Sequence, residues 1–260
     1  MKRANNTQFK ILYGSVVSAG LAILSIAGYR LIHDPVPFPW LVLSLLTVAA
    51  GSLSLKIPGV NGRASVGDAL ICLSVLLFGP LPGAVTAALE GIAGSLRCRT
   101  ASRRFEFLLF NAGAMAVSAY AAGQVLFAIH GRPLLDHGQI TALPVLPGSL
   151  MAFAVTYFAV NTFLVAGASA LERSAGVLQT WRDGFLWTAV NYLAAAFIAG
   201  MLVQFANPVT LPVLATLIAG CAGVHLSSQA HIRLAQQVQR FQEQAASVTP
   251  ADNRADSAAA

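Results

Sequence analysis

The chain has 260 residues, of which 56% are hydrophobic and 10% are charged. Soluble domains carry about 25% charged residues, so this composition excludes an ordinary water-soluble domain and predicts a membrane protein. The net charge of +6 does not indicate a nucleic-acid partner, because the basic residues are confined to short connections between apolar runs.

Apolar segments follow one another along the whole chain, separated by short connections rich in Pro, Gly and Arg. We therefore expect an all-α protein, a polytopic transmembrane bundle of about eight membrane segments, two of them short and joined by a Gly/Pro turn. The segments are 11–32, 40–55, 65–79, 82–96, 106–129, 148–171, 185–206 and 209–226.

Lys and Arg residues are unevenly divided between the two sides of this bundle. With the N-terminus placed in the cytoplasm, only Arg30 and Arg132 of the 16 Lys and Arg residues fall on the outer side. Such a bias is typical of membrane proteins that keep their basic connections inside the cell. The sequence thus predicts a multi-pass protein of the bacterial inner membrane with both termini in the cytoplasm.

Segments 65–79 and 82–96 meet at Gly79-Pro80-Leu81-Pro82-Gly83, which no straight helix tolerates. Each arm is about 21–23 Å long at 1.5 Å per residue, against a hydrocarbon core of about 30 Å. Two short spans return the chain to the cytoplasm, and so does a re-entrant hairpin that never crosses. The charge bias does not separate these alternatives, and we expect the two short spans.

Glu90 lies within the apolar arm 82–96, on a helix face whose other members are small. The opposite face is bulky and is expected to contact lipid, so Glu90 is expected to point into the protein. The small face comprises Gly83, Thr86, Ala87, Ala93 and Gly94, and the bulky face comprises Val85, Leu89, Ile92 and Leu96. Glu90 is thus either a ligand or proton site or a hydrogen-bonded structural residue.

Four further polar residues complete the set of ligand-binding candidates. Asp68 lies near the cytoplasmic end of its segment, where it caps the helix, pairs with Arg63 or binds a ligand. Asn111, Asn161 and Asn191 each lie within an apolar segment, where asparagine usually bonds to a neighbouring helix. The alternative is that they line a polar cavity together with Glu90, Tyr157 and Gln204.

Motifs for catalysis or metal binding do not occur in the sequence. Cys72, Cys98 and Cys221 are far apart and lack the spacing of metal ligands. The chain contains no P-loop, dinucleotide-binding fingerprint, nucleophile elbow or zinc-binding helix. We expect no enzymatic activity, no metal and no cofactor.

The chain is expected to divide into a transmembrane bundle at 1–228, a cytoplasmic amphipathic helix at 229–248 and a disordered tail at 249–260. The helix carries an apolar seam with heptad spacing at Leu234, Val238, Phe241, Ala245 and Val248. We expect this helix to pair with a second copy in a homodimer, to bind a cytoplasmic signalling partner, or to lie on the bundle or membrane.

Three stretches carry a family resemblance: LKIPGVNGRASVGDALICLSVLLFGPLPGAVTAALEGIAGSLR, FLLFNAGAMAVSAYAAGQVLF and YFAVNTFLVAGASAL. Together they resemble the membrane-embedded sensory module (MASE-like) found ahead of HD-type phosphohydrolase and diguanylate cyclase domains in bacteria. The GD…FGPLPG portion is also similar to substrate-binding S subunits of energy-coupling vitamin transporters. The resemblance implies a membrane bundle with a ligand cavity. It does not imply cyclic-nucleotide chemistry, because the chain ends after a short stub where such sensors continue into an output domain.

We therefore expect an integral membrane sensory or interaction module without catalytic output, which binds a small or lipophilic ligand within the bundle. The expected partners are the lipid bilayer, which surrounds the bundle, and a second copy or a cytoplasmic signalling protein, which binds the final helix. The alternatives are an S-component-like transporter subunit that binds a vitamin-sized solute near Glu90 and a structural membrane protein without a ligand.

Overall fold

The computed structural model describes residues 7–34, 38–51, 54–56, 63–97, 104–131, 135–136, 139–140 and 147–205. All of them belong to the first of the two units into which the chain divides, Met1–Ile218 and Ala219–Ala260. The expected segment 209–226, the amphipathic helix 229–248 and the tail 249–260 lie outside the described residues.

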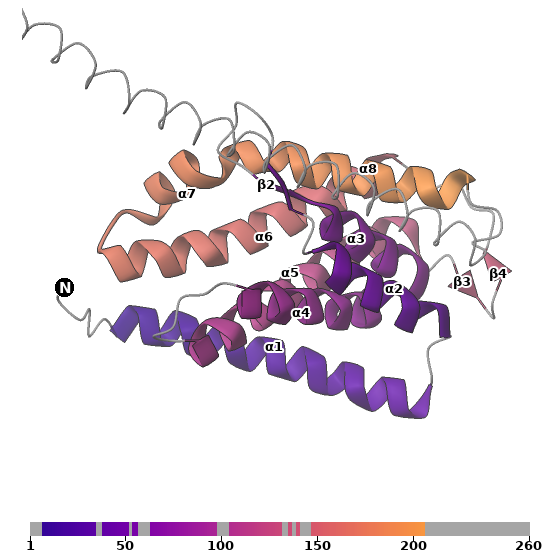
Figure 1. Cartoon of the computed structure of the whole chain (residues 1–260), viewed down its shortest axis with the longest axis horizontal. Coiled ribbons are helices and arrows are strands. Elements are labelled where there is room, and N and C mark those ends of the chain that lie inside the picture. Colours follow the sequence, from indigo (N-terminus) through magenta and orange to yellow (C-terminus); the bar gives the residue numbers. More distant parts are fainter. Residues whose placement is uncertain are drawn as a thin grey trace, which may run out of the picture. The chain divides into compact units, whose positions relative to one another are not determined.

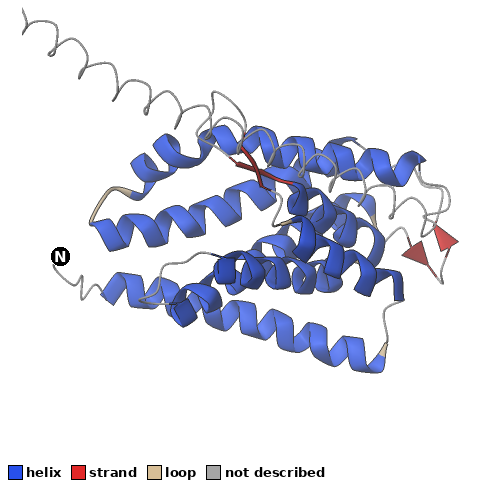
Figure 2. Ribbon diagram, viewed as in Figure 1, coloured by secondary structure: helices blue, strands red, loops and turns tan. Residues whose placement is uncertain are grey.

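Helices make up nearly all of the described chain, as the expected all-α class requires (Figure 1 and Figure 2). They are α1 (Thr7–His33), α2 (Phe38–Ala50), α3 (Val66–Phe78), α4 (Pro80–Arg97), α5 (Arg104–His130), α6 (Pro147–Arg173), α7 (Val177–Phe185) and α8 (Ala189–Phe205), with a 3₁₀ turn, η2 (Leu186–Thr188), between the last two.

Two short antiparallel strand pairs lie in the connections. β1 (Ser54–Lys56) pairs with β2 (Arg63–Ser65), and β3 (Leu135–Asp136) pairs with β4 (Gln139–Ile140). The segment expected at 40–55 is therefore shorter as a helix, because α2 ends at Ala50 and its last residues enter β1. The last helical hydrogen bond of α2 is donated by Gly51 N–H to Thr47 O at 2.8 Å. The hydropathy of the sequence shows that the segment is apolar but does not show where its helix ends.

Three helices, α1, α5 and α6, are long and apolar enough to cross a membrane. A fourth span results if α7 and α8, which are bent by 59° relative to each other, are counted as one. Among the described residues α2 and α3 are also apolar but shorter. The structure thus supports a membrane protein with three to four spanning helices, and the arrangement of about eight membrane segments stays a prediction.

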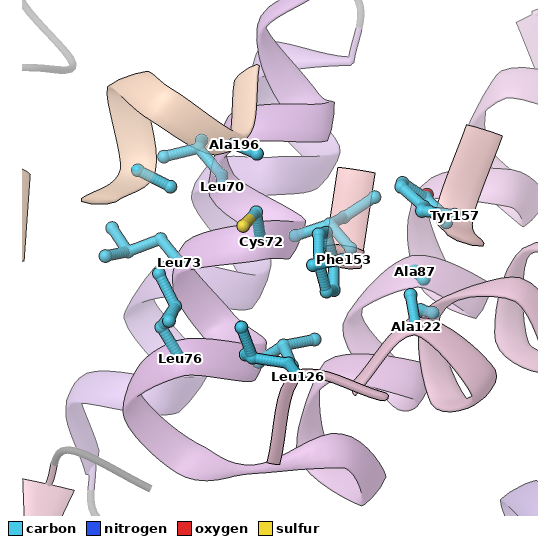
Figure 3. Packing of buried hydrophobic residues seen from close by; sticks show 14 of the residues in the cluster. Leu70, Cys72, Leu73, Leu76, Ala87, Ala122, Leu126, Phe153, Tyr157 and Ala196 are labelled. Carbon is cyan, nitrogen blue, oxygen red and sulfur yellow. The ribbon is translucent and has the colours of Figure 1, made fainter. Parts of the chain in front are cut away.

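α3 lies at the centre of the hydrophobic core. Every residue from Ala69 to Leu77 is buried, with at most 8% of its surface exposed. Figure 3 shows side chains of α3 packed among residues of α5, α6 and α8, including Leu73, Leu126, Phe153 and Ala196. α3 is therefore covered by its neighbours, mainly α2, α4 and α8, and is the element around which these helices assemble.

α3 and α4 fold back on each other at Gly79, whose φ of +97° favours glycine. A Cβ atom on Gly83 would overlap Cγ2 of Val75, and the hydroxyl oxygens of Ser74 and Thr86 lie 3.0 Å apart. Val75 and Gly83 are each four residues from Gly79, and Ser74 and Thr86 are five and seven residues from it. The two helices are therefore an antiparallel hairpin, as the Gly/Pro turn predicts.

The hairpin lies along α5, with α4 antiparallel to it. A Cβ atom on Gly91 would stand 3.0 Å from the backbone oxygen of Asn111, and one on Gly123 would stand 3.0 Å from Cβ of Pro80. The turn of the hairpin therefore reaches a point seven residues before the end of α5 at His130, a distance of about 10 Å along the helix.

α1 is attached to the bundle along a narrow strip. Its buried residues are Val16, Gly20 and Ala27, and it contacts mainly α5. Figure 1 shows α1 at one edge of the helices and α8 at the opposite edge. The exposed face of α1 carries large apolar side chains, among them Leu21, Ile26 and Ile32, which suit contact with lipid.

Candidate functional site

The two faces predicted for α4 are largely present. Gly83, Thr86 and Ala87 are buried, while Leu89 and Leu96 are 40% and 63% exposed. Gly94, which was assigned to the inward face, is an exception, since a Cβ atom there would meet nothing within 4 Å.

The assignment of Ile92 to the lipid-facing side holds only in part, because Ile92 is partly buried. Ile92 packs against a cluster of small residues from α4 and α5, namely Ala84, Ala88, Ala112 and Ala116. α4 has this second buried face because α5 presents small residues at the same height, which lets the two helices approach closely.

The carboxyl group of Glu90 points toward the end of α2. A Cβ atom on Gly51 would stand 2.5 Å from Oε1 and 2.9 Å from Cγ of Glu90. Gly51 has no side chain and so leaves room for the carboxyl group at this point. The inward orientation expected for Glu90 is therefore present, and Gly51 is a residue of this site that the sequence analysis did not single out.

Asp68 lies in the first turn of α3, where a negative charge is favoured by the helix dipole. Because α3 and α4 are antiparallel, the start of α3 lies beside the later part of α4, and Asp68 and Glu90 interact electrostatically. The same two carboxyl groups interact electrostatically with Tyr157 of α6 and Tyr192 of α8. Four helices therefore contribute titratable side chains to one region of the interior.

The two tyrosines are held in place by aromatic and polar contacts. Their ring centroids are 5.3 Å apart in an edge-to-face arrangement. The Tyr157 hydroxyl group donates to Sδ of Met115 at 3.7 Å, and Nδ2 of Asn161 donates to the Tyr192 hydroxyl oxygen at 2.8 Å. Within the described part of the chain, Oδ1 of Asn161 is buried and has no hydrogen-bond partner.

We call Asp68, Glu90, Tyr157, Asn161 and Tyr192 the carboxyl–tyrosine cluster. It brings together three of the five residues predicted as ligand-binding candidates. Tyr192 was missed by the sequence analysis, although its position next to Asn191 within an apolar segment was an available signal. Carboxylate and amide oxygens accept hydrogen bonds, and tyrosine hydroxyl groups both donate and accept them, so the cluster suits a cationic or donor-rich group.

Asn111 and Asn191 are placed differently. Nδ2 of Asn111 donates to Gly91 O and to Ser95 Oγ, both at 3.1 Å, and so joins α5 to α4. Asn111 therefore bonds to a neighbouring helix, which is the first of the two roles expected for asparagine in a membrane segment. Asn191 lies near the start of α8 and is partly buried.

A second polar group, centred on Thr86, joins the hairpin to α2. The Thr86 hydroxyl oxygen lies 2.8 Å from Ser44 Oγ and 3.0 Å from Ser74 Oγ, and it accepts from Trp40 Nε1 at 3.2 Å. Thr86 and Ser74 are fully buried. Each of these side chains has a partner, so this group stabilises the packing of three helices and offers no open ligand site.

Metal ligation has no candidate in the described residues, where no three or more His, Cys, Asp or Glu side chains gather. No family model matches the chain, and neither a curated protein nor a solved structure matches it. The resemblances to a sensory module and to vitamin-transporter S subunits therefore stay expectations drawn from the residues quoted above.

Proposed function

We propose that this chain is a multi-pass protein of the bacterial inner membrane that binds a small ligand at the carboxyl–tyrosine cluster and acts as a sensory module. The observation that carries the proposal is the contact of Tyr157, Tyr192 and Asn161 between α6 and α8, at a place where the charges of Asp68 and Glu90 influence both tyrosines. Ionisable groups inside a membrane bundle are costly and frequently mark functional sites. The ligand carries a positive charge or several hydrogen-bond donors.

The position of the cluster favours sensing over capture of an external solute. Asp68 is the third residue of α3, and Glu90 lies in the half of α4 remote from the turn at Gly79. The connection before α3 carries Arg63, and the connection after α4 carries Arg99 and Arg103, all of which the charge bias assigns to the cytoplasm. With α3 and α4 as two short spans, a ligand at the cluster is nearer the cytoplasmic face.

The cluster can be tested by identifying what the protein carries. The wild-type chain, Glu90→Gln and Asp68→Asn are purified in lipid nanodiscs, and bound small molecules are identified by native mass spectrometry. Glu172→Gln is the matched control, because Glu172 is exposed at the end of α6. A molecule that is present in the wild type and the control, and lost from both other variants, supports the proposal. Equal occupancy in all four chains contradicts it.

Signal output is assigned to the segment 229–248, which lies outside the described residues. Deleting residues 230–260 is expected to abolish association with a cytoplasmic partner or with a second copy, while ligand occupancy is retained. Cross-linking in membranes followed by mass spectrometry measures that association. Unchanged association after the deletion contradicts a sensory role for this segment.

A transporter subunit uses the same cluster but has a different readout. For that alternative, cells that express the chain together with an energising partner accumulate the identified ligand, and Glu90→Gln cells do not. Ligand occupancy without uptake supports the sensory module. Saturable uptake that depends on Glu90 contradicts the sensory module and supports the transporter subunit.

A further inference from the structure

α7 is a nine-residue helix that has no buried residue, and Trp181 packs it against Phe158 and Phe163 of α6. The indole Nε1 of Trp181 donates to Thr162 Oγ1 at 2.8 Å, and its ring stacks on Phe163 with centroids 4.7 Å apart. At η2 the chain bends by 59° from α7 into α8. Figure 1 shows α7 inclined to α8 beside the end of α6.

The exposed surface of α7 combines apolar and charged side chains. Leu178 is 67% exposed, and Leu186, at the start of η2, is 47% exposed. The side chains of Arg182 and Asp183 are 75% and 59% exposed. Leu178 and Arg182 are four residues apart in the helix, so they lie one turn apart on the same side.

Neither bulk water nor the hydrocarbon core satisfies this combination. Water leaves the two leucines unburied, and hydrocarbon leaves Arg182 and Asp183 without hydration. The boundary between headgroups and acyl chains accommodates both kinds of side chain, because a long basic residue reaches the headgroups while its apolar neighbours enter the acyl region. Tryptophan is also enriched at this boundary.

Helix lengths agree with such a position. α6 has 27 residues and is about 40 Å long, so it exceeds a hydrocarbon core of about 30 Å and one end reaches beyond it. α7 follows α6 after three residues and folds back beside it. α8 has 17 residues, about 25 Å, which with η2 approaches a full crossing without any contribution from α7.

We propose that α7 lies in the headgroup–acyl boundary of one leaflet, with acyl chains against Leu178 and Leu186 and phospholipid phosphate groups at Arg182. This assignment goes beyond the proposed ligand site, since it involves none of the residues of the carboxyl–tyrosine cluster. It makes α7 an interfacial helix and α8 the membrane-crossing element that follows it.

Nitroxide labels at two matched positions test this placement. Leu178→Cys and Asp183→Cys are each introduced into the full chain carrying Cys72→Ala, Cys98→Ser and Cys221→Ala, labelled, and reconstituted into vesicles of phosphatidylglycerol and phosphatidylethanolamine. The ratio of oxygen to nickel-chelate accessibility is expected to be several-fold higher at 178 than at 183. High oxygen accessibility at both positions makes α7 the first half of a broken span and overturns the proposal.

The remaining outcomes also overturn the proposal. High nickel-chelate accessibility at both positions places α7 in water, and low accessibility of both labels to both reagents places it against another protein surface, such as a second copy. A measurement without cysteine substitutions guards against misfolding of that background. The difference in quenching between the wild type and Trp181→Phe, in vesicles of brominated lipids, isolates Trp181. Bromine near the carbonyl end of the acyl chains is expected to quench it more strongly than bromine near the methyl end, and the reverse order overturns the proposal.

Discussion

Gly20 of α1 and Gly113 of α5 meet backbone to backbone, such that a Cβ atom on Gly20 would stand 2.5 Å from Cα of Gly113. The atoms that a new methyl group would meet belong to the main chain, which cannot rotate away as a side chain can. Gly20→Ala is therefore expected to push α1 away from α5 and to lower the free energy of unfolding by about 1–3 kcal/mol. Thermal unfolding in detergent micelles measures the loss.

Two other glycines of α1 provide matched controls for this substitution. A Cβ atom on Gly14 or on Gly28 would meet nothing within 4 Å. Gly14→Ala and Gly28→Ala are expected to leave stability unchanged or to raise it by up to about 1 kcal/mol, because alanine is the better helix former. If Gly20→Ala behaves like the controls, the close crossing of α1 and α5 is not present in the membrane.

Gly51→Ala is expected to displace the carboxyl group of Glu90 without unfolding the protein. The atom nearest to a Cβ on Gly51 is Oε1 of Glu90, the end of a flexible side chain that can move at little cost. We expect a change in unfolding free energy below about 1 kcal/mol, together with loss of the molecule bound at the cluster. Native mass spectrometry checks occupancy, with Gly94→Ala on α4 as the control because that position is open.

Thr86→Val is expected to loosen the attachment of the hairpin to α2. The substitution keeps the branched shape but removes the hydroxyl group that Trp40, Ser44 and Ser74 approach within 3.2 Å. Trp40 keeps a bond to Pro82 O at 3.3 Å, but Ser44 and Ser74 lose this buried partner, which is expected to cost about 1–3 kcal/mol of unfolding free energy. Thr86→Ser keeps the hydroxyl group and is expected to retain most of the stability. Equal melting temperatures for the two variants would show that the hydrogen bonds contribute nothing.

Asn111 and Asn161 are expected to respond differently to replacement by alanine. Asn111→Ala removes the bonds to Gly91 and Ser95 and is expected to lower stability by about 1–2 kcal/mol while ligand occupancy is retained. Asn161→Ala removes an amide from the carboxyl–tyrosine cluster and is expected to lower occupancy. Melting temperature and native mass spectrometry are measured on both variants. Loss of ligand from Asn111→Ala alone contradicts these assignments.

The orientation of Glu90 could be predicted from the sequence, but its contact with Gly51 could not. The contrast between a small and a bulky face predicted that Glu90 points inward, because both faces lie on one helix and helical spacing is a local property. The position of Gly51 beside it was not predictable, since that contact depends on how α2 and α4 lie together. Asn111 shows the same limit, because its type and position fit a ligand site and interhelical bonding equally well.

Apolar composition, the break at Gly79 and the spacing of the apolar runs were sufficient to predict a helical membrane protein and a pair of short helices joined by a Gly/Pro turn within 65–96. These features follow from the solvent and from local backbone preferences, which each stretch of sequence carries by itself. Only the tertiary structure showed that α3 lies at the centre of the core, that Asp68 and Glu90 interact and that α7 bends away from α8. Those features depend on packing between segments far apart in the chain, where small residues on one helix set how closely another approaches.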